Sequence, residues 1–158
     1  MEAEEKIKLS SSEGKEFAIT VAAAKGSKVI DGMLQDYPDQ AIPLPEVKTV
    51  TLERVIAYLE HYKGGMPEEI PKPLIDSNIQ RIIPAFDFEF IKDLSLSDCY
   101  DLINAANYLD IPSLLNLGCA FVASKLYDED TNSIREKLGI ESDMTEDEKK
   151  EYEKYSLE

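Results

Sequence analysis

The chain has 158 residues, enough for one domain or one domain with a small appendage, and 43% hydrophobic with 31% charged residues is typical of a folded globular protein. Its formal net charge of −15 repels phosphate backbones and anionic lipid, so we expect no direct binding to nucleic acid or to membranes. No apolar run approaches the roughly 20 residues that cross a bilayer, and the acidic N-terminus is unlike a signal peptide, so we expect a non-secreted protein.

The first part of the chain predicts a hairpin followed by short helices. Apolar residues alternate in 7–9 and again in 17–21, on either side of a glycine-containing turn, as in two antiparallel strands. The period then changes, and short helices are predicted at 21–25 and 28–35. Ser27 is suited to cap the second of these helices.

Prolines and glycines mark the next boundaries. Residues 41–45 contain two prolines and are expected to be extended, as an edge strand or a very short strand. A helix with one apolar stripe is predicted from Thr49 or Thr51 to Tyr62, before two consecutive glycines. Residues 66–84 hold four of the eight prolines without apolar periodicity, so they are read as a connector.

The second half is predicted to be helical. A capping box at 95–98 begins a helix that runs to about Leu109, and Pro112 fits the first turn of the helix that follows. Two shorter helices are expected at 131–138, with Asp130 as cap, and from Thr145, whose side chain pairs with a glutamate three residues later.

The last 31 residues differ in composition from the rest. Residues 128–158 carry −7 of the net charge and too few apolar residues for an independent core. They are either a docking surface that waits for a partner or a frayed acidic tail. The apolar residues of this segment are Ile134, Leu138, Ile140, Met144, Tyr152, Tyr155 and Leu157.

The sequence contains no recognisable catalytic or metal-binding motif. The two cysteines, Cys99 and Cys119, lie among apolar residues at helical spacing and are predicted to be inert core thiols in a reducing compartment, with a reactive or paired role as the alternative. His61 is the only histidine and is expected to lie on an exposed face as a bystander. We therefore expect no enzyme activity, no cofactor and no metal, and a cytoplasmic and nuclear location.

Several short motifs nevertheless match a known family in order. They include IKLSSSEG at 7–14, FDFEF at 86–90 and, as the most specific, AANYLDI at 105–111. IREKLGI at 134–140 and MTEDE at 144–148 match the two C-terminal helices of the same family. With the shorter match at Pro43-Leu-Pro45, the chain resembles the S-phase kinase-associated protein 1 family from about residue 7 to residue 157.

The resemblance implies a fold and a function. The fold is α+β: a BTB/POZ domain at 1–127, a small sheet surrounded by helices, followed by a helical F-box-binding extension at 128–158. The function is that of a non-enzymatic adaptor in an SCF-type E3 ubiquitin ligase, which bridges the N-terminal domain of a cullin to F-box proteins. The alternative is a self-assembling BTB/POZ module, and whether the free protein is a monomer or a weak homodimer stays open.

The resemblance also implies binding residues. Asn107 and Tyr108 occupy the family's cullin-contact pair, and Pro45 is assigned to the same surface. The alternative is that Tyr108 packs inside while Asn107 caps its helix. The residues assigned to F-box binding, about half of which are expected to be real contacts, are Tyr100, Leu115, Cys119, Val122, Leu126, Ile134, Leu138, Ile140 and Met144.

The chain also departs from the family pattern. Phe86 stands where the family usually has a tryptophan, and the sequence contains no tryptophan to match the run that helps to clamp the F-box at the family's C-terminus. Tyr155 or Leu157 is the candidate substitute. Glu146 stands where some members carry a proline that is hydroxylated and glycosylated, so we expect that regulation to be absent.

Overall fold

The computed structural model describes residues 4–127, 129–141 and 144–156, and the side chains up to Glu151 together with those of Glu153 and Lys154. The chain divides into two compact units, Met1–Lys125 and Leu126–Glu158. The sequence-based boundary falls two residues later, between Tyr127 and Asp128, and Asp128 lies outside the described residues. Of the candidate substitutes, the side chain of Tyr155 and the whole of Leu157 also lie outside the described part of the chain. The two units are described separately below.

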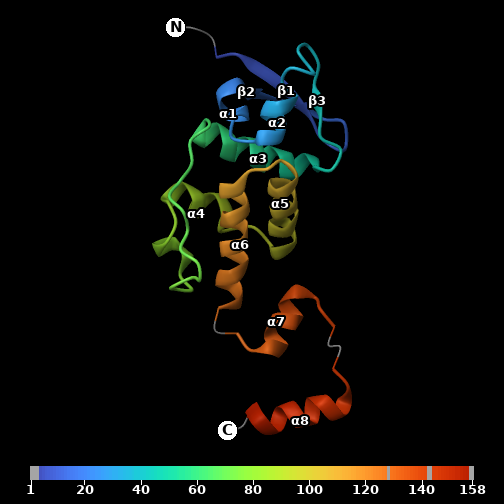
Figure 1. Ribbon diagram of the computed structural model, residues 1–158, viewed down its shortest axis with the longest axis vertical. Helices are drawn as coiled ribbons and strands as arrows, with labels where there is room; N and C mark the ends of the chain where they lie inside the picture. Colours follow the sequence, from blue (N-terminus) through green and yellow to red (C-terminus); the bar gives the residue numbers. More distant parts are fainter. Residues whose placement is uncertain (1–3, 128, 142–143, 157–158) are drawn as a thin grey trace. The chain divides into compact units, whose positions relative to one another are not determined.

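A three-stranded sheet forms the N-terminal part of the first unit (Figure 1). The strands β1 (Lys6–Ser10) and β2 (Glu16–Thr20) pair antiparallel, with Leu9 opposite Phe17, and β3 (Ile42–Pro43) pairs parallel on the other side of β1. The predicted hairpin and the short edge strand are confirmed. Pro43 has no N–H to donate, which suits a strand at the sheet edge.

Side-chain caps begin the first helices. Thr20 Oγ1 accepts from the backbone N–H of Ala23 at the start of α1 (Val21–Ala24), and Ser27 Oγ accepts from Ile30 N at the start of α2 (Lys28–Met33). The next helix, α3 (Thr49–Tyr62), ends at Lys63, whose φ of 44° is left-handed, as is common just beyond a helix. All three helices were predicted.

The sequence analysis assigned no helix or strand to residues 66–94. The structure forms a short 3-10 turn, η1 (Ile79–Arg81), within the connector, and the helix α4 (Ala85–Ile91) directly after it. Phenylalanines at every second position of α4 resemble a strand pattern, which is why helical periodicity does not reveal this element. Packing overrides the local pattern here, because Asp87 and Ile91, four residues apart, are both buried.

Two long helices complete the first unit. The helix α5 (Leu96–Tyr108) is capped by Ser95, which accepts from Asp98 N, and α6 (Pro112–Leu126) begins at the predicted proline. The predicted capping box is only half formed, because the Asp98 carboxylate pairs with Arg54 at 3.5 Å and makes no bond back to Ser95.

The core lies between the sheet and the helices. The helix α3 contacts α1, β2 and α5, and α5 and α6 meet where Cys99 lies against the Gly118 carbonyl (Figure 1). One buried polar contact ties distant segments together, since Ser27 Oγ donates to Leu109 O at 2.5 Å, 82 residues away. A hydroxyl satisfied in this way is stable in an apolar interior.

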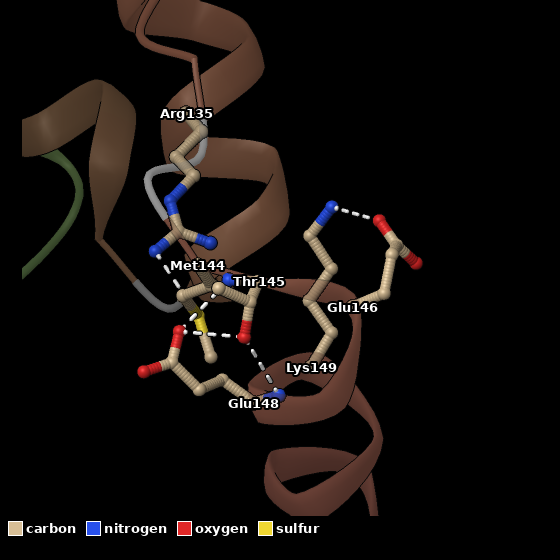
Figure 2. Close-up of polar contacts among 6 residues, drawn as sticks. All are labelled: Arg135, Met144, Thr145, Glu146, Glu148 and Lys149. Carbon is tan, nitrogen blue, oxygen red and sulfur yellow. Dashed lines mark hydrogen bonds and ion pairs between the residues drawn. The ribbon is translucent and has the colours of Figure 1, made fainter.

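The second unit contains α7 (Thr131–Leu138) and α8 (Glu146–Ser156), both where the sequence predicted them. Asp130 caps α7, and Gly139 ends it with a φ of 66°. Before α8, Thr145 Oγ1 accepts from Glu148 N, while the Glu148 carboxylate accepts from Thr145 N, which is the predicted capping box (Figure 2). Among the described residues, no helix combines the length and the apolar character that crossing a membrane requires.

Candidate interaction surfaces

The end of α5 places Asn107 and Tyr108 on the surface of the first unit. Ala105, Ala106 and Leu109 are buried and hold the other side of this turn in the core. Asn107 is exposed, and 36% of the Tyr108 side chain is accessible. The alternative in which Tyr108 packs inside is therefore wrong. A partly exposed tyrosine suits an interface anchor, because its ring is apolar and its tip is polar.

A hollow of about 300 Å³ lies beside Tyr108, and we call it the Tyr108 hollow. Its walls come from α5, from the start of α3 and from the segment before α3. Lys48 crosses the hollow's edge to Asp101, with Nζ 3.4 Å from the carboxylate, in an exposed ion pair worth little to stability. The hollow is lined by Glu46, Val47, Lys48, Thr51, Asp101, Asn104, Ala105 and Tyr108.

Pro45 lies next to this hollow in sequence but not in its wall. It is exposed, while its neighbours Leu44 and Val47 are buried. Asp101, Asn104 and Tyr108 share one face of α5 because they are three and four residues apart. The sequence analysis did not name Asp101 or Asn104, although this spacing from Tyr108 would have found them.

A second surface of the first unit follows α6. Leu115, Cys119 and Val122 are four and three residues apart and therefore lie on one face of the helix. Leu115 and Val122 are half-buried and Cys119 is exposed, whereas Leu117 and Phe121 fill the core on the other side. The prediction that Cys119 lies in the core is wrong, and the prediction that Cys99 lies in the core is confirmed. Burial raises the pKa of the Cys99 thiol to about 11.

Tyr100 lies near the start of α5 and is half-buried. Its hydroxyl oxygen is the one buried side-chain polar atom in the described part of the chain without a hydrogen-bond partner. Burying a hydroxyl without a partner costs free energy, so this tyrosine would gain from a change that brings an acceptor or water to it.

The remaining candidate residues belong to the second unit. No residue of α7 is buried: Ile134 and Leu138 are half-buried, and Ile140 after the helix is 56% exposed. Arg135 donates to the sulfur of Met144 at 3.7 Å and so links α7 to the start of α8 (Figure 2). Leu126, at the end of α6, is half-buried. This unit therefore presents an apolar face that it does not bury itself.

His61 and the cysteines form no recognisable reactive centre. The His61 ring stacks on Phe86, with 3.5 Å between the ring centroids and 4° between the planes. Stacking fixes this exposed imidazole on a hydrophobic partner, a role that the sequence analysis did not foresee. Within the described ranges, no group of three or more His, Cys, Asp or Glu side chains is arranged to hold a metal ion.

A small sheet surrounded by helices, with a helical extension after it, is the α+β architecture of a BTB/POZ-like protein. Two family models match the chain: the Skp1 family tetramerisation domain at residues 5–64 and the Skp1 family dimerisation domain at residues 112–155.

Curated relatives match most of the chain. It is 38% identical over 144 residues to an S-phase kinase-associated protein 1 homolog of Tetrahymena thermophila, covering 90% of this chain and 87% of the relative. It is 34% identical over 145 residues to the E3 ubiquitin ligase complex SCF subunit sconC of Arthroderma otae and of Arthroderma benhamiae, covering 90% of this chain and 87% and 88% of those relatives. The chain belongs to the Skp1 family.

Proposed function

We propose that this protein is a non-catalytic adaptor of an SCF-type E3 ubiquitin ligase, which joins a cullin scaffold to F-box substrate receptors. The observation that carries the proposal is family membership over 90% of the chain, with relatives named as SCF subunits. Two separate sets of accessible residues support it, because an adaptor needs one surface for each partner.

The cullin surface in this proposal is centred on Asn107 and Tyr108, with Pro45 nearby. The Tyr108 hollow supports the assignment, since a partner side chain that enters it would contact Tyr108 and the apolar Val47 at the same time. Aromatic side chains that become buried when a partner binds supply most of the binding free energy in many interfaces.

The test is the double variant Asn107→Lys/Tyr108→Lys, measured by calorimetry against a cullin N-terminal fragment. We expect binding to be lost because two charges would enter a desolvated patch. The matched control is Asn78→Lys/Gln80→Lys, which adds the same charge at two exposed residues outside the hollow. Circular dichroism and F-box binding should be unchanged in both variants. Cullin binding that survives the first variant would contradict the assignment.

The F-box surface in this proposal comprises the exposed side of α6, Tyr100 and the apolar face of the second unit. The partly exposed face around Ile134, Leu138 and Ile140 supports it, because an F-box would supply the apolar cover that this unit lacks. At roughly 25 cal/mol per Å², a few hundred Å² of new apolar burial supplies several kcal/mol, enough to order two short helices.

Hydrogen exchange tests this coupled ordering. We expect the amides after Leu126 to exchange quickly in the free protein and to be protected when an F-box peptide is bound. Deleting residues 128–158 should abolish F-box binding and leave cullin binding nearly unchanged. Equal protection in the free and bound protein would refute coupled ordering, and F-box binding by the deleted protein would refute the surface itself.

Self-association is the second candidate, and the family descriptions favour it. The matching models are those of a tetramerisation domain and a dimerisation domain. A weak homodimer that uses the same apolar face would compete with the F-box. Sedimentation of the free protein from micromolar to millimolar concentration, with and without an F-box peptide, distinguishes a self-assembling module from an adaptor that dimerises only when free.

A further inference from the structure

The first unit contains a cavity, lined by both polar and apolar residues, that belongs to neither of the two proposed surfaces. It has a volume of about 180 Å³ and lies between the connector, α4 and the start of α6. We call it the Asp87 cavity. Pro67, Ile70 and Pro112 supply apolar wall, while Asp87 and Ser113 supply polar groups.

Asp87 is a buried carboxylate whose loss of hydration is only partly offset by hydrogen bonds from the protein. The residue is 1% exposed, and Tyr62 donates to Oδ1 at 2.5 Å. Oδ2 accepts no hydrogen bond from any described residue, and unlike the Tyr100 hydroxyl oxygen it is not completely buried. The desolvation raises the pKa of this carboxyl, although the Tyr62 hydroxyl and His61 act in the opposite direction. A buried anion in this condition is stabilised by a cation placed against its free oxygen.

Other residues around the cavity also favour a cation. Glu68 and Glu69 are exposed residues that also line the cavity, and no described Lys or Arg forms an ion pair with either of them or with Asp87. Ser113 also lines the cavity, and its Oγ receives a hydrogen bond from Tyr58 at 2.9 Å and can accept a second one. The Lys72 side chain is bonded to another lining residue, since its Nζ donates to Asn116 Oδ1 at 3.2 Å.

From this arrangement we propose that the Asp87 cavity binds an organic cation, an alkyl guanidinium or alkylammonium group whose aliphatic stem packs on the connector. The charged head contacts the free oxygen of Asp87 and Ser113 Oγ. The stem lies along Pro67, Ile70 and Pro112, in the way that arginine and lysine side chains cover apolar surface while keeping their heads solvated or paired. The source is either an exposed arginine of a partner chain or a free small amine.

The test uses the intact protein and needs neither a cullin nor an F-box, so its outcome is separate from that of the adaptor proposal. Acetyl-Gly-Arg-Gly-amide, its citrulline counterpart and agmatine are titrated into labelled protein, and the amide shifts of Ile70, Ser113 and Asn116 are followed by NMR. Citrulline has nearly the shape of arginine without the charge, so the comparison isolates the cation.

We expect saturable shifts at these amides with the arginine peptide or agmatine, and the tighter of the two identifies the source. Asp87→Asn should weaken binding by about tenfold or more, as expected for loss of a charged hydrogen bond. Glu89→Gln, the same charge change at an exposed residue of α4, should leave it unchanged. If the citrulline peptide binds equally well, or if neither cation gives saturable shifts, the proposal is overturned and the cavity holds only water.

Discussion

The contact between Gly118 and Ile103 sets the distance between the two helices that carry the first unit's candidate residues. A methyl group on Gly118 would lie 2.5 Å from Ile103 Cγ1 and 3.4 Å from its Cδ1. Both atoms belong to a β-branched side chain that is packed against the core, so it has little freedom to move away. Gly118→Ala should therefore push α5 and α6 apart.

Two opposing effects determine the change in stability. Overpacking costs about 1–3 kcal/mol, whereas replacing glycine by alanine inside a helix gains about 0.8–1.0 kcal/mol. The single variant should thus be destabilised by up to about 2 kcal/mol. In an Ile103→Ala background the clash is absent, and the same change should stabilise the protein by about 0.8–1.0 kcal/mol. Gly118→Ala should therefore destabilise the parent protein and stabilise the Ile103→Ala variant.

Urea unfolding of the four proteins of this cycle measures the coupling. With an m-value of about 2 kcal/mol per M, a coupling of 2 kcal/mol moves the midpoint by about 1 M. Gly32→Ala is the matched control, since a methyl group there meets nothing within 4 Å and should stabilise both backgrounds equally. If Gly118→Ala shifts the midpoint by the same amount with and without Ile103, the packing argument fails.

Three further predictions rest on single groups. Ser27→Ala should destabilise the protein by about 2–4 kcal/mol, since it removes a helix cap and a buried hydrogen bond to Leu109 O. Ser95→Ala removes only an exposed cap and should cost about 1 kcal/mol. Equal shifts of the urea midpoint in the two variants would contradict this. Iodoacetamide should alkylate Cys119 in the folded protein and Cys99 only after unfolding, as peptide mass mapping would report. Because the pKa of Asp87 is raised in the folded state, its contribution to stability is fully present below pH 3.8 and is lost as the pH rises through the folded pKa. The stability of Asp87→Asn relative to the parent protein should therefore increase over that range in urea titrations, and a constant difference would count against it.

The elements that the sequence predicted correctly are those with local determinants. Thr20 and Ser27 begin helices because a hydroxyl can accept from an N–H three residues later, whatever the rest of the chain does. Gly139 ends α7 for an equally local reason, since glycine adopts the left-handed conformation without steric cost. Short-range chemistry of this kind can be read directly from the residues.

The errors arise where distant contacts determine the outcome. Cys99 and Cys119 both have apolar residues at helical spacing, yet the packing of the helices leaves Cys99 buried and Cys119 exposed. The helix α4 depends on burial of Asp87 under Tyr62, 25 residues away. The cullin-binding and F-box-binding residues were predicted from motifs shared with the family, and hydrophobic periodicity did not reveal them. The Tyr108 hollow shows what the motif omits, because three of its eight lining residues come from the segment before α3 and a fourth from the start of α3.

The arrangement of α5 bears on how an adaptor of this size would hold two partners. Tyr100 and Tyr108 are eight residues apart on one helix, which corresponds to about 12 Å along its axis and about 80° around it. Leu102 and Ala106 between them, and Cys99 just before Tyr100, are completely buried, so this helix is fixed in the core along most of its length. The proposed cullin and F-box contacts would then be spaced by a rigid, hydrogen-bonded element. In the proposed adaptor a flexible linker would leave the distance between scaffold and receptor variable, whereas α5 would hold its two tyrosines at a fixed spacing.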